Sequence, residues 1–230
     1  MKIGAIIFVF IPFTLLSEVH HEFWSRLSFN YKLNSNWSFV SEFQLRQQNN
    51  YLLQKEASIY FPHTRSARLW INKKLNKGMT LHISPFAYFR NFDFSRSDSS
   101  TLTQRNEFRA SIALSKSIQY RKFEFKTRLM LENRTLLQPD QWVERIRIQE
   151  WLIYKLKTMK NSSFNPYIMG EYFYRYSNKT LGFDQFRLQS GLLFKSKAVD
   201  IILGMQWAHQ SIEHKTTERL QSQIQVFINL

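Results

Sequence analysis

From residue 23 to the C-terminus, the chain alternates between apolar and polar side chains in short segments. The first segment has two interleaved series: Phe23, Leu27, Phe29, Tyr31 and Leu33 against Trp24, Arg26, Ser28, Asn30 and Lys32. Successive side chains of a β-strand point to opposite faces, so a period of two predicts strands with one apolar and one polar face.

The same pattern recurs along the whole chain and predicts eleven strands. They cover residues 23–33, 37–46, 67–72, 79–90, 105–114, 123–134, 145–156, 167–176, 185–194, 199–207 and 219–230. A twelfth strand is possible within Tyr51–Phe61. Several segments approach the length of a tilted strand that crosses a bilayer, about 10 residues. We therefore expect an all-β, up-and-down antiparallel transmembrane β-barrel of 10–12 strands, with an even number preferred.

The connections between these segments are of two kinds. Short turns are expected at 34–36, 76–78 and 196–198, and longer loops at 47–64, 92–102, 177–182 and 212–217. Outer-membrane barrels have short turns at one end and longer loops at the other. Trp37, Tyr31, Tyr154 and Trp207 lie near strand ends and are expected to form aromatic girdles.

The composition of the polar face favours a membrane barrel over a soluble one. It is rich in Arg, Gln and Glu, which suits paired charges inside a polar lumen. The residues predicted to line the lumen are Glu42, Arg46, Arg68, Glu107, Arg109, Arg128, Glu132, Arg145, Arg147, Glu171, Arg175 and Arg187. The alternative is a soluble periplasmic β-sheet protein with two different faces.

The N-terminus predicts export. Met1 and Lys2 precede an uncharged apolar run from Ile3 to Leu16, which fits the hydrophobic region of a signal peptide. A short anchor or a buried first helix is the alternative. We expect residues 1–17 to be a signal peptide and residues 18–230 to be a single barrel domain in the outer membrane of a Gram-negative bacterium.

The net charge and the composition limit which binding partners can be expected. The formal net charge is +15 and the chain contains no cysteine, so neither disulfides nor thiolate metal sites are expected. The basic residues are spread along the chain instead of being gathered in one patch, which argues against nucleic acid as a partner. No cofactor and no metal are predicted. The oligomeric state is not indicated.

The last segment predicts two partners. Its apolar residues alternate up to the end of the chain: Leu220, Ile224, Val226, Ile228 and Leu230. Outer-membrane barrels end on such a strand, which the barrel-insertion machinery recognises, although a terminal aromatic residue is usual where this chain has Leu230. Outer-membrane lipid is the other expected partner.

Three features resemble a known family. They are the opening hairpin from Glu22 to Arg46, the Lys-Leu-Asn-Lys turn at 74–77, and the Glu-x-Arg pairs Glu107/Arg109 and Glu132/Arg134. Together they are similar to an uncharacterised domain-of-unknown-function family of exported bacterial proteins of about this length. The resemblance implies an outer-membrane barrel and brings no biochemical activity with it.

Motifs for nucleotide binding, zinc proteases and serine hydrolases are absent from the sequence. His20 and His21 are adjacent, which suits a flexible tail better than a metal site. Two His-x-Ser pairs resemble those of outer-membrane phospholipases and lipid A deacylases. His82/Ser84 is expected on the lumen face and His209/Ser211 on the lipid face. Glu213 and Glu218 follow the second pair, but neither spacing identifies a residue that would orient the histidine.

These observations leave three functions open. The first is a small porin-like barrel, passive or favouring anions, because rings of basic residues select anions. Interleaved glutamates also allow a lumen that is simply filled by paired charges. The second is an outer-leaflet lipid hydrolase that uses His209 and Ser211. The third is a structural or surface-binding barrel, and an enzyme is the less expected outcome.

Overall fold

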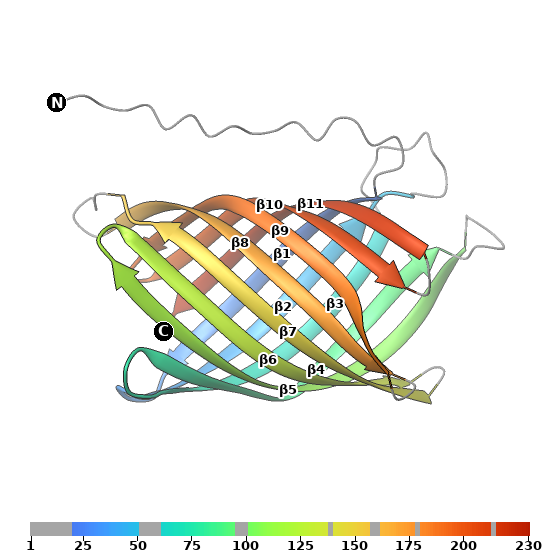
Figure 1. Cartoon of the computed structure of the whole chain (residues 1–230), viewed down its shortest axis with the longest axis horizontal. Helices are drawn as coiled ribbons and strands as arrows, with labels where there is room; N and C mark the ends of the chain where they lie inside the picture. Colours follow the sequence, from blue (N-terminus) through green and yellow to red (C-terminus); the bar gives the residue numbers. More distant parts are fainter. Residues whose placement is uncertain are drawn as a thin grey trace, which may run out of the picture.

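The computed structural model describes residues 20–50, 61–94, 101–137, 140–156, 162–177, 180–212 and 215–230. These residues form a closed barrel of eleven strands that run obliquely around one axis (Figure 1). The strands are β1 (His20–Lys32), β2 (Trp37–Gln48), β3 (Phe61–Lys74), β4 (Met79–Phe94), β5 (Leu102–Tyr120), β6 (Phe123–Leu137), β7 (Asp140–Tyr154), β8 (Ser162–Ser177), β9 (Thr180–Ser196), β10 (Val199–Ile212) and β11 (Lys215–Asn229). The eleven strands expected from the alternation are confirmed.

Neighbours in sequence pair antiparallel, and the barrel closes where β1 pairs with β11. That last pair is parallel, from His20 opposite Arg219 to Asn30 opposite Asn229. An odd number of alternating strands requires one parallel pair at closure. The expected even number is therefore not found among the described residues, and most of the segment 51–61 lies outside them.

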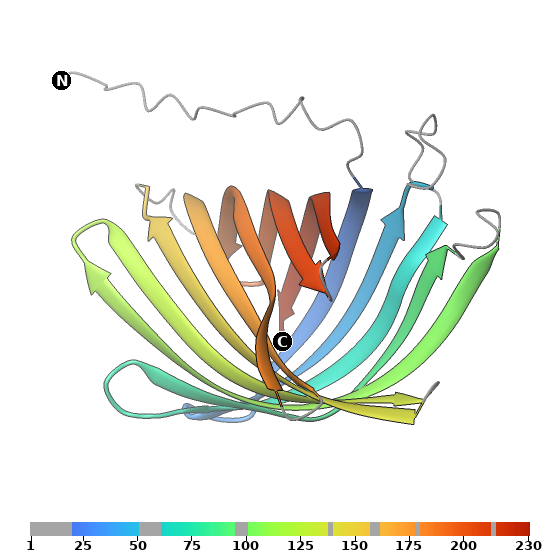
Figure 2. The ribbon, with the colours of Figure 1, turned by 45° about the vertical axis from the view of Figure 1, so that its right-hand side comes forward.

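The connections between the strands lie alternately at the two ends of the barrel. One end, which we call the loop end, holds the start of β1 and the connections β2–β3, β4–β5, β6–β7, β8–β9 and β10–β11. The other, the turn end, holds the remaining connections and the C-terminus (Figures 1 and 2). The prediction of long loops at 177–182 and 212–217 was wrong. There the strands continue to Ser177 opposite Thr180 and to Ile212 opposite Lys215.

Local backbone chemistry explains the tight turns. Between β3 and β4, Lys77 and Gly78 have φ angles of 59° and 73°. Positive φ at both central residues gives a turn whose twist matches that of the flanking strands, and glycine adopts it without steric cost.

The apolar residues mostly face outward. Leu45, Leu131 and Leu203 are about half exposed on the outer surface, as are many other large hydrophobic side chains. Aromatic residues lie toward both rims: Tyr31 and Trp37 at the turn end, and Trp142, which is 67% exposed, at the loop end. A water-soluble protein buries such residues, so this surface suits contact with lipid acyl chains. No helix in the described part of the chain is long and apolar enough to cross a membrane.

Toward the turn end, the interior also contains apolar side chains. Ile153, Tyr167, Met169, Leu193 and Ile202 form one cluster. Here Gly191 of β9 and Gly204 of β10 are register partners. A Cβ atom added at Gly191 would clash with the carbonyl oxygen of Leu203. The absence of two side chains lets Tyr167 pack over these strands, with its hydroxyl accepting a hydrogen bond from Gln189.

Candidate functional site

The candidate site is the lumen, a cavity of about 1040 Å³ with side chains from all eleven strands on its wall. Of these lining side chains, 16 are Lys or Arg and 6 are Asp or Glu. The residues reach from the β1–β2 turn, at Asn34–Trp37, to Arg105 and Arg219 toward the loop end. The wall therefore carries a large excess of positive charge along the barrel axis.

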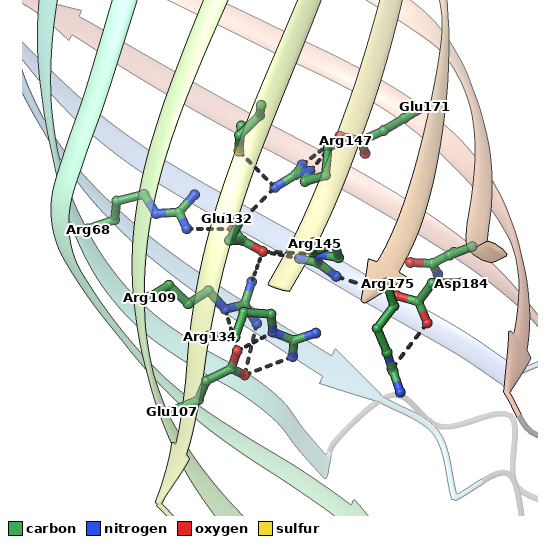
Figure 3. Close-up of polar contacts among 12 residues, drawn as sticks. Arg68, Glu107, Arg109, Glu132, Arg134, Arg145, Arg147, Glu171, Arg175 and Asp184 are labelled. Atoms are coloured by element: carbon green, nitrogen blue, oxygen red, sulfur yellow. Dashed lines mark hydrogen bonds and ion pairs between the residues drawn. The ribbon is translucent and has the colours of Figure 1, made fainter. Parts of the chain in front are cut away.

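Glu132 on β6 is the centre of a network of charged side chains around the cavity, as Figure 3 shows. Its carboxylate accepts a hydrogen bond of 3.0 Å from Arg68, and two hydrogen bonds from Arg145. Arg109 and Arg147 each bring a guanidinium nitrogen to 3.7 Å from it. The Glu132 side chain is fully buried. One carboxylate thus holds four guanidiniums, whose combined charge exceeds its own.

Three further carboxylates complete the network. Glu107 accepts two hydrogen bonds from Arg109, at 2.8 and 3.1 Å, and two from Arg134. Glu171 accepts hydrogen bonds from Arg147 and lies 3.6 Å from a nitrogen of Arg187. Asp184 accepts a hydrogen bond of 3.1 Å from Arg175 (Figure 3). Bidentate pairing of this kind fixes the direction of each guanidinium.

Aromatic rings support the arginines from the other side. Phe173, which is fully buried, has the guanidinium carbons of Arg145, Arg147 and Arg187 at 4.9, 4.9 and 4.5 Å from its ring centroid. The guanidinium carbons of Arg26 and Arg46 lie 4.4 and 4.5 Å from the ring centroid of Trp24. Such contacts are worth up to about 2 kcal/mol when desolvated, and they require no carboxylate.

Two of the lumen arginines differ from the rest. Among the residues that the structure describes, Arg46 and Arg128 form no ion pair with a carboxylate. Arg46 stacks on Trp24, and Arg128 stacks on Trp70 at 4.8 Å. Their charge is therefore available to an anion in the lumen, whereas the charge of Arg145 is shared with Glu132.

The structure brings the sequence-predicted lumen residues together. Eleven of the twelve lie on the cavity wall, and Glu132 lies behind it among the arginines. Sequence reasoning left out Arg26, Arg134 and Asp184, which continue the same polar face. It placed Trp24 on the polar face, but it did not predict that Trp24 or Phe173 would contact arginines. The sequence did contain a signal for these contacts, because aromatic residues on a polar face can stack against arginine side chains.

The adjacent histidines are not a flexible tail, and that prediction was wrong. His20 and His21 begin β1 and point to opposite faces, with His20 buried inside the barrel. Nδ1 of His63 lies 3.2 Å from a carboxylate oxygen of Glu22, and the His20 and His63 rings are 5.5 Å apart. Within the described ranges, no group of three or more His, Asp or Glu side chains is arranged to hold a metal ion.

The two His-x-Ser pairs lie in different surroundings. His82 faces the lumen, with its ring nitrogens 2.7 Å from Oδ1 of Asn72 and 2.8 Å from Oγ of Ser115. His209 faces outward, and its Nδ1 lies 3.7 Å from a carboxylate oxygen of Glu218. Glu218 is the register partner of His209 across the β10–β11 hairpin. Of the two glutamates that follow this pair in the sequence, Glu218 is therefore the one that the structure places beside His209.

The fold and the lumen together define the class of protein. A closed barrel with an apolar exterior and a charged, arginine-rich interior has the architecture of outer-membrane barrels. The chain belongs to the DUF2490 family of proteins of unknown function, whose model matches residues 21–221. No curated protein matches the chain.

Two solved structures of bacterial proteins are similar to the chain. The beta domain of the Bordetella autotransporter BrkA has a TM-score of 0.50 and 7% sequence identity, covering 83% of this chain and 82% of that one. OmpT of Vibrio cholerae, as expressed in the outer membrane, has a TM-score of 0.41 and 9% identity, covering 86% and 92%. At these identities the BrkA likeness shows the fold alone.

Proposed function

We propose that the protein is an outer-membrane barrel whose lumen favours anions. The observation that carries this proposal is the composition of the cavity wall, with 16 basic and 6 acidic side chains. Rings of Arg and Lys select anions in pores. The mature chain would begin near Glu18, after removal of a signal peptide. The C-terminal strand β11 would be its recognition element for the barrel-insertion machinery, and outer-membrane lipid would surround it.

The positions of the basic residues suggest a path for anions through the lumen. Lys32, Lys74, Lys126 and Lys195 line the cavity toward the turn end. Deeper in the lumen, Arg46 and Arg128 present charge that no carboxylate shares within the described residues. Anions would meet the lysines at the mouth and the stacked arginines inside. In this proposal, Glu132 and Glu171 fix the neighbouring arginines and do not act as cation sites, because each is surrounded by guanidiniums.

The test is the reversal potential of the refolded chain in a planar bilayer under a KCl gradient. The wild-type protein should give discrete conductance steps with a potential of the sign set by chloride. Arg46→Gln with Arg128→Gln should reduce this preference. Coulomb's law gives about 0.7 kcal/mol for a unit charge at ~6 Å in water, about a threefold change for each arginine.

Lys197→Gln is the matched control. It removes one positive charge from the β9–β10 turn, outside the cavity wall, and should leave the reversal potential unchanged. A folded, inserted protein that gives no conductance contradicts the pore. An unchanged potential in the double variant contradicts anion selection by Arg46 and Arg128.

A further inference from the structure

The outer surface of the β10–β11 hairpin changes from apolar to polar toward the loop end. From the middle of β10 toward the loop end, the residues on the outer face of the barrel are Leu203, Met205, Trp207, His209 and Ser211. Their partners on β11 include Ile224 opposite Leu203 and Leu220 opposite Trp207. In a membrane, this order places Trp207 where acyl chains give way to headgroups, and it places His209 and Ser211 just beyond.

Three groups at this boundary are of the types that serve as a nucleophile, a base and an orienting acid. Nδ1 of His209 lies 3.7 Å from a carboxylate oxygen of Glu218. A carboxylate on the Nδ1 side of an imidazole favours the tautomer whose Nε2 accepts a proton. Ser211 lies two residues along the same strand, so its side chain is on the same face as His209. The His209 ring also lies 6.0 Å from that of Trp207.

The other His-x-Ser pair, His82 and Ser84, has different surroundings and serves as a comparison. His82 and Ser84 have the same sequence spacing, but they face the lumen. Both ring nitrogens of His82 have neutral partners, Asn72 and Ser115, and Ser84 is fully buried. The pair on β10 instead has a carboxylate at its histidine, and the His209 side chain is 33% exposed. Of the two pairs, only the outward one has a carboxylate beside its histidine and access for a lipid.

We infer that Ser211, His209 and Glu218 form a lateral serine-hydrolase site for fatty-acyl esters of membrane lipids. Oγ of Ser211 attacks the ester carbonyl carbon while Nε2 of His209 takes the hydroxyl proton. The ester C–O bond then breaks, and the leaving alcohol receives the proton from His209. Water attacks the acyl-serine by the same route and releases the fatty acid. Glu218 stabilises the imidazolium in both halves and is a positioning residue.

This activity is separate from conduction through the lumen, although both require the barrel to sit in a membrane. The full mature chain, reconstituted in phosphatidylethanolamine–phosphatidylglycerol vesicles, is exposed to a fluorescent fluorophosphonate. It is then assayed for fatty-acid release from the phospholipid and, in a second arm, from added lipopolysaccharide. The two arms distinguish a glycerophospholipid ester from an acylated glycolipid as the source of the acyl group.

Wild-type protein and Ser84→Ala should be labelled and active, whereas Ser211→Ala should lose both labelling and acyl release. Glu218→Gln should lower kcat by about 100-fold or more with little change in KM, because it removes orientation and leaves lipid binding intact. Conductance should be the same in all four proteins. Labelling of Ser211→Ala at the wild-type level overturns the inference, as does a folded wild-type protein that neither labels nor releases fatty acid.

Discussion

The lumen arginines are held in two different ways, and this difference decides what their replacement does. Arg145 donates to the buried Glu132, so the two groups depend on each other. Arg46 lies against Trp24 and depends on a ring that stays neutral. Removing one member of a buried ion pair leaves an unpaired charge, which costs more than losing the pair as a whole.

Glu132→Gln should be among the most destabilising single changes in the lumen. Four guanidiniums would lose their common anion, and we expect the free energy of unfolding to fall by about 3 kcal/mol. A urea titration of the protein folded in detergent micelles, followed by tryptophan fluorescence, measures this change. Glu144→Gln, at an exposed position on the next strand, should differ little from wild type. Equal midpoints for the two variants would contradict the role given to Glu132.

The alternation along the sequence indicates which face a residue lies on, but it does not indicate its partner. Arg145 and Glu132 could both be assigned to the lumen from a period of two. Their contact also depends on the register between β6 and β7, where Glu132 lies opposite Arg145. His209 and Glu218 are nine positions apart, and the tight β10–β11 connection brings them together. Such distances follow from the hairpin register, which short spacing rules do not contain.

At the scale of strands, the turn chemistry could be anticipated better than the strand ends. Asn76–Gly78 indicated a tight turn, because glycine favours the positive φ that such a turn needs. The polar residues at 177–182 resembled a loop, yet Ser177 and Thr180 pair at the tip of a hairpin. Polar residues are tolerated in strands that project beyond the apolar band, so composition alone did not mark the end of the strand.

A second prediction concerns Gly191 on β9, which lies against the backbone of Leu203 on β10. Gly191→Ala places a methyl group against the backbone of Leu203, which cannot move aside as a flexible side chain could. We expect a loss of about 1–3 kcal/mol in the free energy of unfolding, the usual cost of overpacking. The same urea titration measures it, with Gly182→Ala as the control because nothing lies within 4 Å of its added Cβ. A stability equal to that of the control would show that the strands can separate without cost.

At the scale of the whole barrel, the parallel closure separates the two chain ends. His20 lies beside Arg219 near the beginning of β11, while Leu230 lies at the other end (Figure 1). In a membrane-spanning barrel, these two positions are on opposite sides of the bilayer. The even number typical of bacterial barrels would place them on the same side.

Epitope tags therefore test the topology directly. In intact cells, a tag placed immediately ahead of His20 and a tag after Leu230 should differ in their access to external protease. A tag in the β2–β3 connection is the reference, and it should behave like the tag ahead of His20. Identical access at both chain ends would contradict the eleven-strand closure.

Arg68 reaches Glu132 from a strand that is three positions away around the wall, since one residue lies on β3 and the other on β6. Neighbouring hairpins can form and pair one after another, because their contacts are local in sequence. A bond that spans β4 and β5 must wait until the sheet has curled, and the β1–β11 seam must wait for the whole chain. Contacts of such long sequence separation slow folding. The charged lumen is therefore a late product of assembly, completed in the same period as the closing seam.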